Sequence, residues 1–526
     1  MRRLPGTASI FAFALAAAMQ LAPRAATAAG AAEVAWLDAA SDADIERAFA
    51  QARAEKKPLL IYWGAKWCPP CNQLKATLFN RQDFIERSRA FVPVNIDGDL
   101  PGAQKLGARF KVRGYPTMVL FDGQGAELTR LPGEADAPQV MQVLQLGLAG
   151  GRPVKAVLAD AVARKPLSAN EWRLLAFYSW DTDEAQLVPP TERPGLLVTL
   201  AAACPPSEAQ TATRLWLKAL AASDASQGVK ADAALRLRVM KVLADPAAAR
   251  AHMDVLTNSA VEITRAITTP EAGGQRAPVL AAFNRALQRL EADTTLSRAD
   301  RMGALMARVD LARLDVARNA KADSKTVKLS APLLKDVREQ VARADREITD
   351  GYERQAVITA AAQLLSQAGR GDESDALLEA NLAKSHSPYY LMSQLAGNAK
   401  ARGDTAQALR WYEQAYDKSE GPATRLQWGA SYLSALVDLA PHDAPRIERA
   451  AEALLAEAAA QPNAFYERSA RSLQRVGAKL RGWNAGGAHA DVVRRLQARL
   501  APVCAALPAN DGQRSTCEGL FKGEAA

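Results

Sequence analysis

The sequence predicts an α/β domain followed by a large all-α region of helical hairpins. An apolar run of strand length, Leu59–Trp63, leads into the motif Trp67–Cys71. Roughly 45 residues later, Arg113–Thr117 leads into a second apolar run, Met118–Phe121. After Gly150–Pro153 the chain is rich in Ala and Leu and is interrupted by Pro, Gly or Asp about every 12 to 20 residues. The first two observations predict the α/β part, and the third predicts the helices.

The motif Trp-Cys-Pro-Pro-Cys carries two cysteines that can close a disulfide within one helical turn. Pro69 and Pro70 fit the first turn of a helix, where backbone N–H groups lack intrahelical partners. These groups and the positive end of the helix dipole favour a thiolate at Cys68, and Lys66 adds a nearby cation. Cys68 is therefore predicted to be the nucleophile. Cys71 is predicted to be the resolving thiol that attacks the mixed disulfide.

The cysteine pair has two alternative roles. A structural zinc site needs four ligands, and no second CxxC or paired histidine follows, so no metal is expected. The four histidines are isolated along the chain: His252, His386, His442 and His489. A purely structural disulfide is the second alternative, because such bridges occur in exported chains. It does not require prolines at the helix start or the segment before Met118.

Residues of about 36 to 150 resemble the thioredoxin fold. The predicted elements follow the thioredoxin order: a helix opened by a capping box at Ser41–Asp44, a strand at Leu59–Trp63, the CxxC helix, a strand at Phe91–Asp97, a helix near Ala103–Phe110, strands at Thr117–Phe121 and Glu127–Leu131, and a helix from about Pro138 to Leu148. The resemblance implies a central mixed sheet flanked by helices, with the domain extending over residues 29–150. No organic cofactor is implied.

The resemblance also implies a cis peptide bond at Tyr115–Pro116, lying across from Cys68. In the family, this loop offers backbone hydrogen bonds to an extended substrate and keeps metal away from the thiols. The residues then expected to support the active site or contact the substrate are Trp67, Pro69, Pro70, Tyr115 and Pro116.

Two positions depart from the family pattern. Many thioredoxins carry a buried Asp six residues before the first cysteine, where this chain has Tyr62. The Lys that usually faces this Asp also lacks a counterpart, since its approximate position holds Pro93. Proton transfer from the resolving thiol must then use water, Tyr62 or another group.

Two further features are similar to exported thioredoxin-like domains. Lys57–Pro58 before the strand and Thr77–Phe79 after the motif are closer to the C-terminal domain of DsbD. The Pro-Pro dipeptide is common in TlpA-like reductants. Both features favour a reductase, although the direction of electron flow depends on tens of millivolts that a sequence does not specify.

The N-terminus predicts a secretory signal peptide over residues 1–28. Met1–Arg3 is basic, Ser9–Ala16 is apolar, and Ala26–Ala28 has the form of a cleavage site. The apolar part is shorter than the ~20 residues that span a bilayer. With a composition of bacterial character, these features place the protein in the periplasm. No later stretch is long and apolar enough to span a membrane.

The charge of the chain excludes one class of partner. The formal net charge of +9 is spread over 526 residues, and the predicted signal peptide contributes three of the arginines. No basic run or cluster of basic and aromatic residues occurs. Nucleic acid is therefore not expected as a partner.

Residues 151–526 predict helical hairpins, partly of tetratricopeptide character. Gly371-Asp372 precedes Ala376-Leu377, and the same pairs recur at Gly403-Asp404 and Ala408-Leu409 with a spacing of 32. This is similar to tetratricopeptide repeats, whose unit is about 34 residues, and it places such units near 355–420. Trp428–Ala440 with Ala450–Pro462 is predicted to form a third, stretched hairpin. Such a region either binds a polypeptide or a partner, or serves as a rigid scaffold.

Three cysteines lie outside the motif. Cys504 and Cys517 flank the turn at Pro508–Gly512, and in an oxidising compartment a disulfide between them would contribute about 3 kcal/mol. Cys204 is then left over. A buried, inert thiol is favoured for it over a redox role.

Together these features predict a periplasmic thiol–disulfide oxidoreductase that reduces disulfides of exported proteins through Cys68 and Cys71. Its expected partners are protein disulfide substrates and an electron-donor thiol–disulfide protein. One alternative is an interaction or adaptor protein whose helical tail recruits clients. Another is a disulfide isomerase or oxidase.

Overall fold

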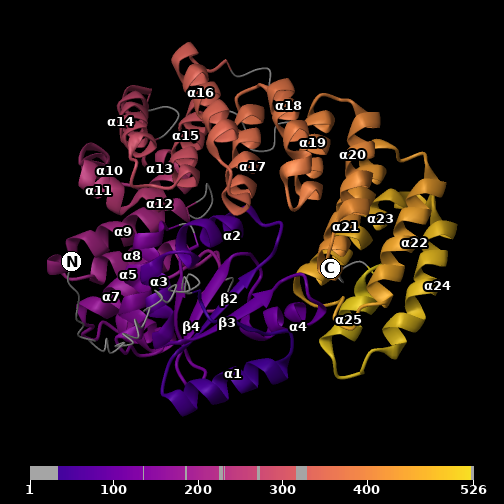
Figure 1. Ribbon diagram of the computed structural model, residues 1–526, viewed down its shortest axis with the longest axis horizontal. Helices are drawn as coiled ribbons and strands as arrows, with labels where there is room; N and C mark the ends of the chain where they lie inside the picture. The colour runs from indigo at the N-terminus through magenta and orange to yellow at the C-terminus, as the bar shows by residue number, and fades with distance from the viewer. Residues whose placement is uncertain are drawn as a thin grey trace, which may run out of the picture. The chain divides into compact units, whose positions relative to one another are not determined.

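The structure is a computed structural model that describes residues 33–133, 135–183, 186–223, 229, 231–268, 273–314 and 328–522 (Figure 1). The predicted signal peptide lies outside these residues. Val34–Ala526 forms one compact unit. No helix in the described ranges combines the length and apolar character required to cross a membrane.

A five-stranded sheet in the order β1-β3-β2-β4-β5 forms the centre of the N-terminal part. The strands are β1 (Leu37–Asp38), β2 (Leu59–Gly64), β3 (Val92–Asp97), β4 (Thr117–Phe121) and β5 (Glu127–Leu131). β3 runs parallel to β1 and β2, whereas β4 runs antiparallel to β2 and β5. All of β2 is buried, as expected for a strand in the middle of a sheet covered on both faces. The mixed sheet predicted from the sequence is confirmed.

Helices cover both faces of this sheet. They are α1 (Asp42–Glu55), α2 (Pro69–Leu74), α3 (Gln82–Arg87), α4 (Pro101–Phe110) and α5 (Ala137–Leu148), and a π-helical turn (Lys75–Phe79) continues α2. Because successive strand residues point to opposite faces, Ile61 and Trp63 of β2 pack with α1 and α4. Leu60 and Tyr62 pack with α2 and α5 on the other face.

The remainder of the described chain is helical, as predicted. Its helices are α6 (Val154–Val162), α7 (Ala169–Phe177), α8 (Arg193–Ala203), α9 (Ala209–Ala221), α10 (Ala233–Ala244), α11 (Pro246–Ala251), α12 (Met253–Asn258), α13 (Ala260–Ile267), α14 (Gly273–Ala292), α15 (Arg298–Ala312), α16 (Ala331–Glu347), α17 (Gly351–Gln367), α18 (Gly371–Asn381), α19 (Pro388–Ala401), α20 (Thr405–Lys418), α21 (Pro422–Leu439), α22 (Ala444–Ala459), α23 (Glu467–Trp483), α24 (Ala490–Ala506) and α25 (Gly512–Gly519).

The predicted repeat units fall on neighbouring helix pairs. α17 packs against α18, and α19 packs against α20. Gly371 begins α18, and Gly403 occupies the turn between α19 and α20 with φ of +79°, a conformation that favours glycine. The recurring Gly-Asp pair thus coincides with hairpin turns, and the assignment to tetratricopeptide repeats stays a prediction.

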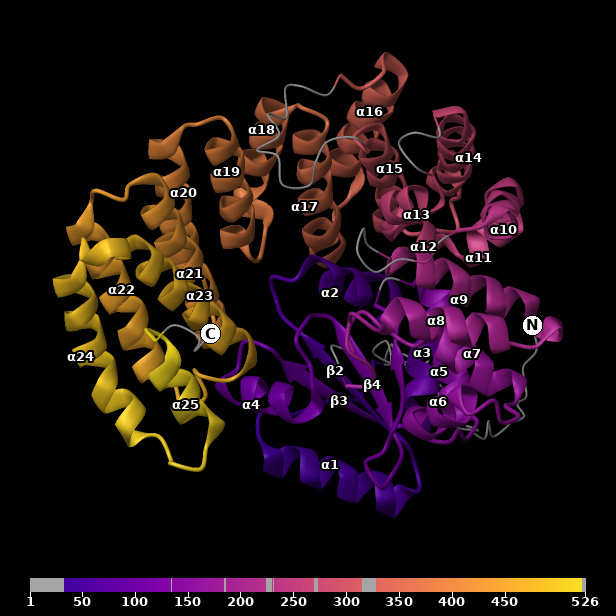
Figure 2. The same ribbon diagram turned by 180° about the vertical axis from the view of Figure 1, so that it is seen from behind.

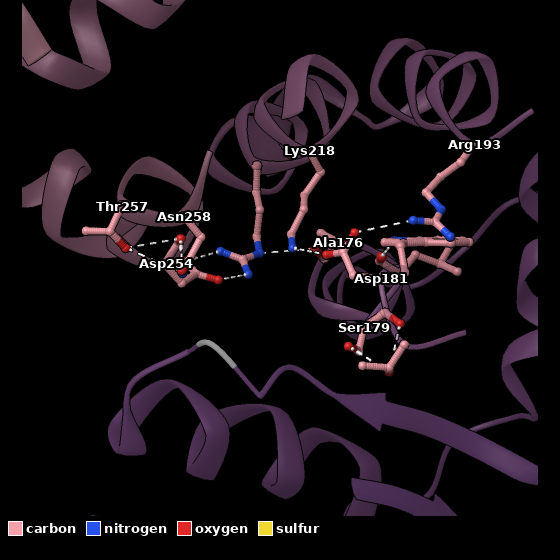
Figure 3. A network of polar contacts seen from close by, with 12 residues as sticks. Ala176, Ser179, Asp181, Arg193, Lys218, Asp254, Thr257 and Asn258 are labelled. Carbon is pink, nitrogen blue, oxygen red and sulfur yellow. Dashed lines mark hydrogen bonds and ion pairs between the residues drawn. The ribbon is translucent and has the colours of Figure 1, made fainter. Parts of the chain in front are cut away.

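A buried ion pair joins three helices of the region that follows the sheet (Figure 3). Arg214 on α9 donates to both carboxylate oxygens of Asp254 on α12, at 2.9 and 2.5 Å, and to the carbonyl of Ala176 on α7 at 3.0 Å. Burial alone would raise the pKa of Asp254, but the guanidinium lowers it to about 2. Beside it, Lys218 and Arg193 both reach Asp181.

The three other cysteines form one disulfide and leave one free thiol. Cys504 and Cys517 form a disulfide that joins α24 to α25, with Cα atoms 5.5 Å apart. Cys204 is a buried free thiol at the end of α8, and burial raises its pKa to about 11. A thiol with this pKa carries almost no thiolate at neutral pH, which suits an inert core residue.

Two glycines on α23 provide a matched test of packing at the C-terminus. A Cβ at Gly477 would lie 2.0 Å from the carbonyl oxygen of Leu520, whereas nothing lies within 4 Å of one at Gly482. We expect Gly477→Ala to lower the free energy of unfolding by about 1–3 kcal/mol through overpacking. Gly482→Ala should raise it by about 0.5–1 kcal/mol, because Ala favours a helix. Urea unfolding measures both; equal effects would contradict the close approach.

Candidate active site

The cysteine pair lies at the start of α2, just after β2. Cys68 is the N-cap residue of α2, and its Sγ accepts a hydrogen bond from the backbone N–H of Cys71 at 3.2 Å. Pro69 and Pro70 occupy the first turn of the helix, as predicted. At a helix N-terminus the unpaired N–H groups and the dipole stabilise negative charge on sulfur.

Cys68 and Cys71 form a disulfide with a Cα–Cα distance of 5.2 Å. Both residues are buried, with exposed fractions of 2% and 0%. Trp67 and Tyr115 pack against the pair. In the described part of the chain, no group of three or more His, Cys, Asp or Glu residues could hold a metal ion.

The loop before β4 is the second half of the site. The peptide bond Tyr115–Pro116 is cis. Pro116 is buried, and the hydroxyl of Tyr115 donates to the carbonyl of Gly98 at 3.4 Å. Burial raises the pKa of Tyr115, so it remains a neutral phenol. The structure thus brings together Trp67, the cysteine pair and this loop, while Pro69 is half-buried and Pro70 is exposed.

The cation at Lys66 is engaged by a residue that the sequence did not suggest. Its ammonium group lies 2.9 Å from the carboxylate of Glu420, just before α21. Its carbonyl accepts from Asn72 at 2.9 Å. Glu420 therefore offsets part of the positive charge that Lys66 was expected to offer to the Cys68 thiolate.

Tyr62 does not replace the buried Asp of thioredoxins as a proton acceptor. Its hydroxyl is buried and has no hydrogen-bond partner among the described residues, and burial, reinforced by the Asp97 carboxylate, raises its pKa. The phenol therefore stays protonated at neutral pH. It lies over Gly64, where a Cβ would be only 2.2 Å from the hydroxyl oxygen.

Asp97 is the carboxyl group on the same face of the sheet. Its Cα pairs in register with Gly64, so its side chain points toward the face that α2 covers. Burial raises the pKa of Asp97, and the charge of the Asp99 carboxylate acts in the same direction. The backbone N–H of Asp99, which donates to Asp97 at 3.0 Å, lowers this pKa, as do Lys75 and Arg468. Sequence reasoning missed this residue, although its position at the end of β3 was a usable signal.

Several helical-region side chains contact the loops around the cysteine pair. Arg468 on α23 reaches Asp99, and Thr424 on α21 accepts from the indole N–H of Trp67 at 2.9 Å. The side chain of Gln355 donates to the Trp67 carbonyl at 3.4 Å. A ring nitrogen of His386 lies 3.0 Å from the Lys66 carbonyl. No local pattern marks these residues, because each lies about 290 or more positions from its contact.

Comparison with known proteins agrees with this geometry. A family model described as a thioredoxin-like domain matches residues 45–147. A thioredoxin-like protein of Synechocystis is 34% identical over 90 residues, which cover 81% of that protein and 17% of this chain. The chain belongs to the thioredoxin-like family. The matched residues include both cysteines and the cis-proline loop, which supports thiol–disulfide chemistry in general.

Two other relatives are named as thiol:disulfide interchange proteins. DsbD of Yersinia pestis is 32% identical over 99 residues, and DsbD 2 of Pseudomonas aeruginosa is 28% identical over 120 residues. The matches cover 18% and 22% of this chain, and the chain spans only 16% and 20% of the length of these relatives. The similarity therefore concerns the thioredoxin-like domain alone.

Asp97 should make stability depend on pH. Because burial raises its pKa above 3.8, folding favours the protonated form. The contribution of Asp97 to stability is complete below its pKa in the unfolded chain. This contribution is lost as the pH rises through its pKa in the folded chain. We expect Asp97→Asn to be more stable than the wild type at pH 7 and equally stable near pH 3. Urea unfolding across this range measures the difference, and a difference independent of pH would contradict the assignment.

Proposed function

We propose that this chain is a periplasmic thiol–disulfide oxidoreductase that reduces disulfides of exported proteins. The observation that carries the proposal is Cys68 at the start of α2, one turn from Cys71 and beside the cis bond at Tyr115–Pro116. The helix N-terminus stabilises the thiolate that attacks, and the second thiol lies close enough to resolve the product.

The reaction has two exchanges. The Cys68 thiolate attacks one sulfur of a substrate disulfide, which forms a mixed disulfide and releases the other substrate sulfur as a thiolate. The Cys71 thiolate then attacks the Cys68 sulfur, which releases the second substrate thiol and closes the internal disulfide. An electron-donor thiol–disulfide protein supplies the two electrons that reopen the pair.

Asp97 is the group that takes the proton from Cys71 in this mechanism. It shares the α2 face of the sheet with Tyr62, which keeps its own proton. The charged groups that act on the Asp97 carboxylate are Lys75, Asp99 and Arg468. A raised pKa makes a carboxylate a better base, since proton transfer is most efficient when the pKa approaches the working pH.

The proposed location rests on two features. The predicted signal peptide at residues 1–28 would direct the chain out of the cytoplasm. The disulfide Cys504–Cys517 joins two helices far from the redox pair, and such structural bridges persist in oxidising compartments.

A second candidate is an interaction protein whose thioredoxin-like domain turns over little. The observation that favours it is the packing of the helical region over Trp67, which half-buries a side chain expected to face the partner. The helices would then recruit a client, and the cysteine pair would serve mainly to bind it.

Substitution of each cysteine separates the two candidates. We expect Cys68→Ser to abolish reduction of protein disulfides, because no attacking thiolate is left. Cys71→Ser should retain the attack and accumulate mixed disulfides that cannot be resolved. Dithiothreitol-coupled reduction and non-reducing gels after acid quenching measure both. Full activity of Cys68→Ser would refute the oxidoreductase, and absence of mixed disulfides with Cys71→Ser would favour the interaction protein.

The role of Asp97 is tested by the rate at which the internal disulfide closes. We expect Asp97→Asn to slow the resolving step by about a hundredfold at neutral pH, the effect of losing one general base. The control is the first step: in a Cys71→Ser background, attack by Cys68 should be unchanged by Asp97→Asn. Rapid-quench alkylation resolves the two steps. A resolving rate that keeps the wild-type pH profile would exclude Asp97.

A further inference from the structure

Arg468 holds the helical region against the loop that follows β3. Its guanidinium donates to the carboxylate of Asp99 at 2.7 Å and to the carbonyl of Gly98 at 3.1 Å. The exposed fractions of the two charged side chains are 11% and 9%. The backbone N–H of Arg468 also donates to Gln104 on α4 at 3.1 Å.

The same guanidinium lies over both aromatic rings that flank the cysteine pair. It is 5.3 Å from the ring of Trp67 and 5.2 Å from the ring of Tyr115. Cations attract the faces of aromatic rings at such distances. Arg468 therefore covers the two side chains that an extended substrate is expected to meet.

Other aromatic side chains of the helical region complete the cover over Trp67. Tyr390 on α19 stacks on its ring at 6.0 Å, and Trp428 on α21 meets its edge at 5.1 Å. Figures 1 and 2 both show α17 next to α2, and α21 and α23 next to α4. The face around Trp67 thus belongs to an interior contact.

Residues at the margin of the cysteine pair are exposed, although the two cysteines themselves are buried. Pro70 on α2 is exposed, and so are Arg113 and Gly114 in the loop before the cis bond. Arg113 nevertheless contacts α23, because its carbonyl accepts from Arg471 at 2.8 Å. A substrate that reaches Cys68 past these residues must be narrow, because α17 packs against α2 and α23 contacts the loop at Arg113. A small disulfide or an extended segment of polypeptide fits this restriction.

We propose that the helical region restricts the Cys68–Cys71 pair to small or extended disulfides, and that Arg468 is the residue that determines this specificity. The inference rests on the proposed oxidoreductase function. Loss of the guanidinium leaves the Asp99 carboxylate buried without its charged partner, which weakens the contact between α23 and the redox site. The cover over Trp67 then opens more often, and folded substrates gain access.

The experiment compares two probe disulfides on the full-length reduced protein. Glutathione disulfide is small, and insulin carries its disulfides on a folded surface. Rapid-quench alkylation measures how fast each probe oxidises the cysteine pair. We expect Arg468→Ala to raise the insulin rate relative to the glutathione disulfide rate by about tenfold, which corresponds to about 1.4 kcal/mol of weakened docking. Because Arg468 also acts on Asp97, a change in the resolving step enters the rates with both probes and cancels in their ratio, which is the quantity compared.

Arg475→Ala is the matched control, because Arg475 lies on the same helix, is exposed and makes its polar contact with Ser472 at 3.5 Å. Arg475→Ala should leave the ratio of the insulin rate to the glutathione disulfide rate unchanged. Asp99→Asn removes the charge from the other side of the contact and should raise the ratio as Arg468→Ala does. Circular dichroism checks that each variant is folded. If Arg468→Ala does not fold, the result with Asp99→Asn provides the test.

The outcomes separate the specificity from the function. An unchanged ratio in folded Arg468→Ala or Asp99→Asn overturns the role of Arg468. The same rise in Arg475→Ala also overturns it, because the effect would then follow from any loss of positive charge on α23. Failure of the wild type and all variants to react with glutathione disulfide refutes the oxidoreductase itself.

Discussion

The ion pair between Arg468 and Asp99 couples the redox domain to the helices that follow it. The two residues are 369 positions apart, and both charges are removed from water. A buried charge is tolerated only when it is paired and hydrogen-bonded, so neither α23 nor the loop after β3 can shift alone. The carbonyl of Gly98 accepts from both Arg468 and Tyr115, which extends the same constraint to the cis-proline loop.

This coupling bears on how accessible the cysteine pair is in the folded chain. In the local sequence, Cys68 stands at the exposed start of a helix, where thiolate chemistry needs access. In the folded chain it is 2% exposed, and the neighbouring ring of Trp67 belongs partly to the core of the C-terminal helices. In the proposed mechanism, the helix terminus provides the reactivity of Cys68, whereas the helical region provides the selectivity for substrates. Under this proposal, chemistry and access are controlled by different parts of one chain.

Glycine shapes the surface at which these parts meet. Gly421 has φ of +87°, which side chains rarely adopt, and a Cβ there would lie 2.7 Å from the Cβ of Asp99. Thr424, three residues later, donates to the Asp99 carboxylate. The start of α21 thus fits closely around the same acidic side chain. Close packing of this kind is disturbed by a single added methyl group. Access to the thiols, as proposed above, therefore depends on how well α21 and α23 pack.

The sequence by itself determined the elements and the chemistry that depend on neighbouring residues. The apolar run Leu59–Trp63, the prolines of the first helical turn and the CxxC spacing act over a few positions, so the strand, the N-terminus of α2 and the disulfide were predictable. Only the tertiary structure decided that Glu420 pairs with Lys66 and that Asp97 shares a face with Tyr62. It also decided that Arg468 covers the site. These contacts depend on burial and on partners hundreds of residues away, and an arginine on an amphipathic helix carries no local signal of the charge that it will meet.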